Sequence, residues 1–104
     1  MPTVSLKRGV FITGSHPCIF AMIDAAKKAY YFLGMDVVIT SGCEGTHSTK
    51  SLHYQGKALD FRTRHLTDGE RVEIMDRMKA DLGEDYDILY EGDHFHCEYD
   101  PKPE

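Results

Sequence analysis

Two short segments of the sequence carry side chains that can bind a metal ion. The first, residues 51–60, contains His53 and ends at Asp60. The second, residues 93–96, has an aspartate followed by histidines at alternate positions. Alternate side chains of a β-strand point to one face, so both imidazoles of the second segment are expected to face the same way. Two histidines and one carboxylate form a typical catalytic zinc site, which keeps a further position open for water.

Such a site requires the two segments to meet in space. Zinc holds nitrogen and oxygen ligands at about 2.0–2.2 Å, so residues distant in the sequence must converge. Gly56 lets the backbone turn tightly between His53 and Asp60. The elements that carry these residues therefore decide whether the site can form.

The apolar pattern predicts short strands that carry both segments. We expect strands at residues 10–13, 36–40, 57–63, 85–91 and 94–99, and a loop at residues 41–52. In the strand at 57–63, Asp60 shares a face with Ala58 and Arg62, while Leu59 and Phe61 point the other way. Cys97 is expected in the core, because it alternates with the histidines of its strand. A turn at residues 92–93 joins the last two strands.

Two amphipathic helices are expected between these strands. The first begins near Ser15 or His16, with Pro17 in its first turn, and ends at Gly34. Its expected apolar face is Ile19, Ile23, Ala26, Tyr30 and Leu33. The second begins at a capping box formed by Thr67 and Glu70 and ends at Gly83. Its expected apolar stripe is Val72, Met75, Met78 and Leu82.

These elements predict the fold class. Residues 1–104 are expected to form a single α+β domain, a small, largely antiparallel sheet with two main helices packed on one face. Residues 98–104 are expected to be a frayed tail.

The two segments also resemble a known family. The pattern S-x-H-x-x-G-x-A-x-D over residues 51–60, followed by H-x-H at 94–96, is similar to the zinc metallopeptidases that include D-Ala-D-Ala carboxypeptidases and L-alanyl-D-glutamate endopeptidases. That family shares its fold with the hedgehog signalling domain, which residues 46–48, 51–54 and 94–97 resemble most. The resemblance runs over about residues 37–99. A compact chain with neither a signal-peptide pattern nor a wall-binding module is expected for small bacterial or bacteriophage members of this family.

The resemblance implies roles for individual residues. His53, Asp60 and His96 correspond to the zinc ligands, and Asp93 to the general base. Zinc lowers the pKa of bound water from 15.7 to about 7, and a nearby carboxylate can take its proton and pass it to the leaving amine. Glu91 is the alternative base.

Other residues are candidates for contact with the substrate or with the metal ligands. They are His47, His94, Ser51 and Lys50. Either of the two histidines is a candidate donor to the oxyanion, or a group that orients a ligand.

One position departs from the family's pattern. Its carboxypeptidases carry an arginine shortly after Thr-Ser-Gly, whereas residues 40–44 here read Thr-Ser-Gly-Cys-Glu. Glu44 would repel a substrate carboxylate, and Lys50 offers a cation without the guanidinium fork. An endopeptidase is therefore favoured over a D,D-carboxypeptidase.

The resulting expectation is a peptidase that binds one zinc ion per chain and cleaves peptidoglycan stem peptides. The main alternative is a zinc-stabilised, non-catalytic binding or virion structural module of the same fold. A structural zinc site at Cys43, His47 and Cys97, and a thiol enzyme using Cys97, are weaker readings.

The composition of the chain excludes some classes of binding partner. The formal net charge of −5 argues against nucleic acid and against binding an anionic membrane by charge. Three cysteines without a C-x-x-C spacing argue against a disulfide framework. The amino-terminal residues lack the pattern of a secretory signal. We therefore expect a protein that is cytoplasmic as synthesised. A monomer is favoured, and the resemblance implies the cell wall as the site of action.

Overall fold

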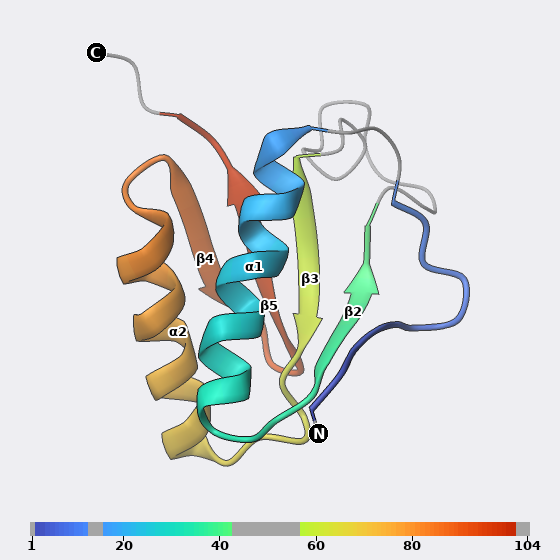
Figure 1. Ribbon diagram of the computed structural model, residues 1–104, viewed down its shortest axis with the longest axis vertical. Helices are drawn as coiled ribbons and strands as arrows, with labels where there is room; N and C mark the ends of the chain where they lie inside the picture. Colours follow the sequence, from blue (N-terminus) through green and yellow to red (C-terminus); the bar gives the residue numbers. More distant parts are fainter. Residues whose placement is uncertain (1, 13–15, 43–56, 102–104) are drawn as a thin grey trace.

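The computed structural model describes residues 2–12, 16–42 and 57–101. These residues form a five-stranded sheet and two helices (Figure 1). In chain order the elements are β1 (Val4–Leu6), α1 (Pro17–Phe32), β2 (Val37–Ser41), β3 (Ala58–Arg62), α2 (Asp68–Leu82), β4 (Tyr86–Tyr90) and β5 (His94–Tyr99).

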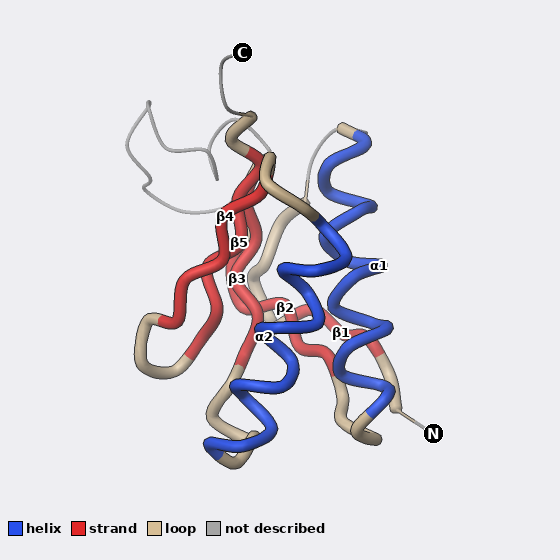
Figure 2. The backbone as a smooth tube through the Cα atoms, turned by 90° about the vertical axis from the view of Figure 1, so that its left-hand side faces the viewer, coloured by secondary structure: helices blue, strands red, loops and turns tan. Residues whose placement is uncertain are grey.

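The sheet has the strand order β1-β2-β3-β5-β4. Among the described strands, β1 and β2 run parallel, and the three other neighbouring pairs are antiparallel. Both helices lie on the same face of the sheet (Figure 2). The predicted α+β class, with a largely antiparallel sheet and two helices on one face, is therefore confirmed.

Helix boundaries follow the local signals in the sequence. Pro17 begins α1, and Gly34 follows its last turn with a positive φ of 73°, a conformation that glycine adopts easily. The capping box of α2 is present: the Glu70 amide donates to the Thr67 hydroxyl, and the Thr67 amide donates to the Glu70 carboxylate. These local hydrogen bonds satisfy amide groups that the first helical turn leaves unpaired.

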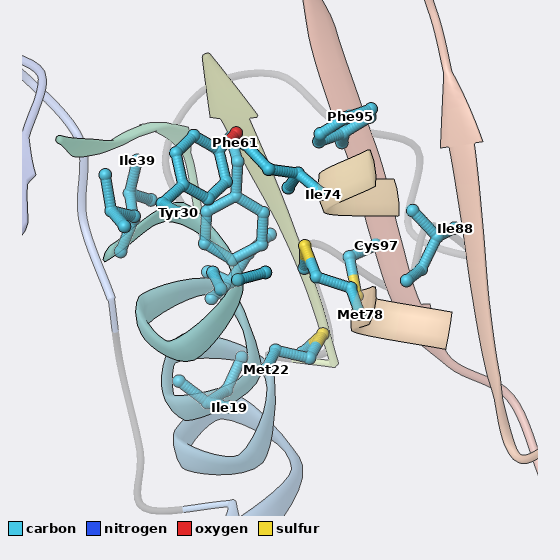
Figure 3. Close-up of a cluster of buried hydrophobic side chains, with 14 of the residues drawn as sticks. Ile19, Met22, Tyr30, Ile39, Phe61, Ile74, Met78, Ile88, Phe95 and Cys97 are labelled. Atoms are coloured by element: carbon cyan, nitrogen blue, oxygen red, sulfur yellow. The ribbon is translucent and has the colours of Figure 1, made fainter. Parts of the chain in front are cut away.

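The core lies between the helices and the sheet (Figure 3). β3 and β5 contribute alternate apolar side chains, whereas α1 contributes a nearly continuous small and apolar face. The fully buried large side chains are Tyr30, Phe61, Phe95, Ile19, Met22, Ile39, Leu59, Ile74, Met78, Val37 and Cys97.

The predicted apolar stripe of α2 is partly wrong. Ile74 and Met78, four residues apart, are the buried positions, whereas Val72 is 50% exposed. Met75 and Leu82 are half-buried against the core. The helix turns this face inward because it packs against both α1 and β4, which a single-helix pattern does not encode.

The first predicted strand is also wrong. Residues 10–12 form no strand, and Thr13 lies outside the described residues. The sheet instead begins at β1, whose three residues pair with β2. Val10 and Ile12 still pack against the core, while Phe11 is exposed.

The end of the chain needs one further correction. β5 continues through Glu98 to Tyr99, and the Asp100 amide donates to the Asp85 carbonyl at 2.8 Å. Residues 98–100 are therefore held by the sheet and its edge, not frayed as expected.

Candidate metal centre

Asp60 and His96 lie directly opposite each other on neighbouring antiparallel strands, β3 and β5. Their neighbours in the chain, such as Phe61 and Phe95, are buried in the core. Strand alternation therefore sends the carboxylate and the imidazole to the face of the sheet away from the helices. Oδ1 of Asp60 is 2.9 Å from Nδ1 of His96, and both side chains are more than four-fifths buried.

A second carboxylate holds the other side of the His96 ring. Nε2 of His96 is 2.8 Å from Oε1 of Glu98, two residues along β5. The hydrogen bond with Asp60, reinforced by that with Glu98, outweighs burial and raises the pKa of His96 to about 9. Without a metal, this imidazole is therefore protonated at neutral pH and donates to both carboxylates.

Asp60 and His96 are two of the three predicted zinc ligands, and their oxygen and nitrogen atoms are of the types that zinc binds. A metal-bound histidine usually donates its remaining N–H to a carboxylate or carbonyl, which fixes the ring. Here Nδ1 faces the predicted ligand Asp60, and Nε2 already faces Glu98. The sequence analysis noted no role for Glu98, although strand alternation puts it on the same face as His96.

Four of the predicted site residues lie outside the described part of the chain. They are the third predicted ligand, His53, and the candidates His47, Lys50 and Ser51. The same holds for Cys43 and Glu44. The described half of the site thus consists of Asp60, His96, His94 and Asp93, which the structure brings together.

His94 lies among three carboxylates. Its Nδ1 is 2.7 Å from Asp93, and its Nε2 is 3.2 Å from Glu91 and 3.6 Å from Asp60. Burial alone would lower the pKa of His94, but hydrogen bonds with Asp93 and Glu91 and the charge of Asp60 raise it. A protonated ring can donate to its acidic neighbours on both sides.

The candidate base Asp93 is well exposed. The hydrogen bond with His94 lowers the pKa of Asp93, so its carboxylate is ionised at neutral pH. Its side chain is 79% exposed and hence accessible to water. The competing candidate, Glu91, contacts the opposite nitrogen of the same ring.

The two candidate bases differ in whether they line a cavity of about 260 Å³. Asp93, His94 and Asp60 all line it, whereas Glu91 does not. The remaining lining residues are Lys7, Thr40, Ser41, Arg62 and Arg64. The cavity therefore favours Asp93 as the carboxylate that faces the same space as Asp60.

A separate acidic cluster lies at the other end of this sheet face. Within the described ranges, Asp87, Glu98 and Asp100 are the one group of three whose ligand atoms lie within 4.8 Å of one another. Exposed acidic groups of this kind are common without an ion. This cluster is distinct from the predicted zinc ligands, although Glu98 contacts one of them.

Cys97 does not face the site. It is fully buried in the core, as predicted, and burial raises the pKa of its thiol. A catalytic cysteine needs an accessible thiolate, so this environment opposes the thiol-enzyme reading.

The chain matches no protein-family model and no curated protein sequence. In the described residues, neither helix combines the length and the apolar character needed to cross a bilayer.

Proposed function

We propose that this chain is a zinc-dependent peptidase that hydrolyses a peptide bond in peptidoglycan stem peptides, acting as an endopeptidase. The observation that supports it best is the buried cross-strand pair of Asp60 and His96, with Asp93 lining the same cavity as Asp60. The choice of peptidoglycan rests on the sequence resemblance. We further propose a monomer, made in the cytoplasm, whose site of action is the cell wall.

The ion would be held by Asp60, His96 and His53, one per chain. Zinc in such a site polarises a carbonyl oxygen and lowers the pKa of water to about 7. The Glu98 carboxylate would orient the His96 ring through its contact with Nε2.

The remaining described residues supply the proton transfers and the stabilisation of charge. Asp93, ionised at neutral pH, accepts the proton of the attacking water and returns it to the leaving amine. His94 lies beside the cavity, held by Asp93 and Glu91, and their hydrogen bonds raise its pKa and so favour its protonated form. There it stabilises the negative charge that develops on the carbonyl oxygen.

One observation favours the non-catalytic alternative. The hydrogen bond from His94 lowers the pKa of Asp93 and so weakens it as a base. A zinc-stabilised binding module would keep Asp60 and His96 as metal ligands and would need no general base.

The decisive experiment is mass spectrometry of defined muropeptides incubated with the zinc-loaded protein. Asp93→Asn should retain zinc and lose at least about a hundredfold in turnover. Asp76→Asn, an exposed carboxylate on α2, is the matched control and should remain active. Absence of any cleavage by the zinc-loaded wild type would refute the peptidase and favour the binding module.

A further inference from the structure

We propose that the outer edge of β4 binds an extended, cationic segment of a partner protein as an additional strand of the sheet. The segment would present apolar side chains beside Ile88 and Leu89, and a lysine or arginine beside Asp87. This inference goes beyond the proposed function, because it requires neither zinc nor the hydrolysis of a bond.

β4 is an edge strand without the usual protection against pairing. It is the last strand in the sheet order, beside β5 (Figure 1). Its five residues pair with β5 in a continuous register, without a bulge, and they include one charged residue and no proline. The opposite edge strand, β1, is only three residues long. Short strands, bulges, prolines and lysines normally keep an edge from adding a further strand, and β4 has none of these features.

The backbone of β4 offers hydrogen-bonding groups on its outer side. The Glu91 amide donates to the His94 carbonyl at 2.9 Å, at the start of the ladder between β4 and β5. Residues that bond to the partner strand alternate along an antiparallel ladder, so Ile88 and Tyr90 turn their N–H and C=O groups outward. Within the ranges that the structure describes, no strand lies beyond β4. An added strand would pair with these groups.

A groove of about 790 Å³ follows this edge and is called the edge groove below. It is lined by residues from both faces of β4: Ile88 from the helix side, and Asp87 and Leu89 from the face away from the helices, here called the open face. Gly83, after the end of α2, lines it as well. Because both faces of the strand contribute, the groove lies along the backbone edge, where an extended segment would bind.

Two large apolar side chains of β4 remain exposed. Leu89 is 53% exposed and Tyr90 is 41% exposed. Leu89 lies opposite His96 on the open face, and both helices lie on the other face of the sheet (Figure 2). Exposed apolar side chains on an edge strand favour association, so the partner is expected to place an apolar side chain beside Leu89.

The charges along the edge groove favour a cationic partner. Its lining holds three carboxylates and one ammonium group, at Glu84, Asp87, Glu98 and Lys79 respectively. Asp87 and Glu98 lie opposite each other, and one carboxylate oxygen from each, with one from Asp100, lie within 4.8 Å of one another. Like charges at this separation repel, so a cation on an added strand is attracted to this position and an anion is repelled.

The same charges oppose a second copy of this chain at the edge. Two β4 strands paired with each other would bring the acidic groups of both copies onto one open face. Each copy also carries a net charge of −5, which adds to the repulsion. A cationic partner segment meets the same backbone groups and apolar side chains without this cost.

Strand pairing determines the order of side chains in the partner. In an antiparallel arrangement, the partner residue opposite Ile88 lies on the helix side and should be apolar. Its two neighbours lie on the open face, one opposite Leu89 and one opposite Asp87. The first of these should be apolar and the second cationic. The edge is therefore expected to bind a segment with two apolar residues followed by a lysine or arginine.

The test is an NMR titration of the isotopically labelled full chain with a designed peptide, acetyl-Thr-Val-Val-Arg-Thr-Arg amide. Its control has glutamate in place of both arginines. The cationic peptide should bind at least about tenfold more tightly, with the largest shifts at the amides of Ile88 and Tyr90. Methylation of one alternate set of peptide nitrogens should abolish binding, because that set donates to β4, whereas methylation of the other set should be tolerated.

A matched pair of variants tests the edge itself. Leu89→Lys places a cation on β4 and should weaken binding of the cationic peptide about tenfold. Leu6→Lys makes the same change on the other edge strand, β1, and should bind the peptide like the wild type. Both leucines are about half exposed, at 53% and 50%, so both variants should fold, as circular dichroism can verify.

Several results would overturn the proposal: undetectable binding, equal binding of the two peptides, binding that tolerates methylation of either set, or a folded Leu89→Lys variant that binds like the wild type. Protection of the Ile88 amide that rises with the concentration of the protein alone would assign the edge to a second copy and would also overturn it. None of these measurements depends on zinc or turnover, so the peptidase proposal is tested separately.

Discussion

The ring of His96 lies between the carboxylates of Asp60 and Glu98. If a metal takes the Nδ1 side, Glu98 still holds the ring orientation from the Nε2 side. Glu98→Ala should therefore weaken zinc affinity about 10–100-fold, measured by competition with a chromogenic chelator. The fold should persist, because the substitution removes one of three clustered acids. The control Glu84→Ala removes an exposed acid just before β4 and should bind zinc like the wild type. Equal zinc affinities of the wild type and both variants would show that Glu98 does not belong to the site.

Tyr30 links α1 to the end of β3. Its hydroxyl donates to the Arg62 carbonyl at 2.8 Å, so Tyr30→Phe should lower the free energy of unfolding by about 0.5–1.5 kcal/mol at neutral pH. Burial raises the pKa of Tyr30 above its usual value of 10.0. Folding therefore favours the neutral phenol, and this contribution is present below pH 10 and lost as the pH rises above it.

The loss of folding stability at alkaline pH tests the raised pKa of Tyr30. Urea unfolding at neutral pH and near about pH 10.5 should show a smaller alkaline loss of stability for Tyr30→Phe than for the wild type. Tyr31→Phe, on the same helix but half-buried, is the control and should follow the wild type. An identical alkaline loss in Tyr30→Phe would contradict this account.

At the residue scale, much of the described site was predictable. The alternation of strands alone puts Asp60, His94, His96 and Glu98 on one face, away from the core. Arg62 was also predicted on that face. Arg62 and Lys7 line the same cavity. Lys7 directly follows β1, a strand that the sequence did not predict.

Among the elements, the end of β2 depends on a close contact with the segment at residues 10–12. A Cβ atom on Gly42 would lie 2.6 Å from the backbone oxygen of Phe11, closer than real contacts allow. Because backbone cannot move as cheaply as a flexible side chain, Gly42→Ala should destabilise the fold by about 1–3 kcal/mol in urea unfolding. Gly69→Ala, in α2 with open space around its Cβ position, should be neutral or slightly stabilising. Similar stabilities of the two variants would show that this contact is unimportant.

Local signals explain why some elements were predictable and others were not. Pro17, Gly34 and the Thr67–Glu70 capping box mark helix ends through bonds between residues close in sequence. β1 is only three residues long and is held by β2, more than thirty residues away. The choice of Ile74 over Val72 as the buried residue of α2 likewise depends on contacts with α1 and β4, which periodicity does not contain.

At the scale of the whole molecule, the proposed metal centre would join the neighbouring strands β3 and β5. An ion bound only by the folded protein stabilises it by RT ln(1 + [L]/Kd), about 2.7 kcal/mol at a hundredfold excess over Kd. Saturating zinc should therefore raise the melting temperature by about 10 °C or more, because about 1 kcal/mol shifts a domain of this size by 4–8 °C. Differential scanning calorimetry with and without a chelator measures this shift.

Asp60→Asn is the matched variant for calorimetry. It should fold yet gain little from zinc, since it keeps the shape of the side chain and loses the charge. A melting temperature of the wild type that is indifferent to zinc would contradict a site between β3 and β5.

The measurement that tests the central claim most directly is native mass spectrometry of the purified protein in the presence of zinc. The wild type should carry one zinc ion per chain, and the Asp60→Ala/His96→Ala double variant should carry none. The exposed pair Asp76→Ala/Glu84→Ala should still carry one. A wild type without bound zinc, or a double variant that retains it, would show that the cross-strand pair of Asp60 and His96 is not a zinc site.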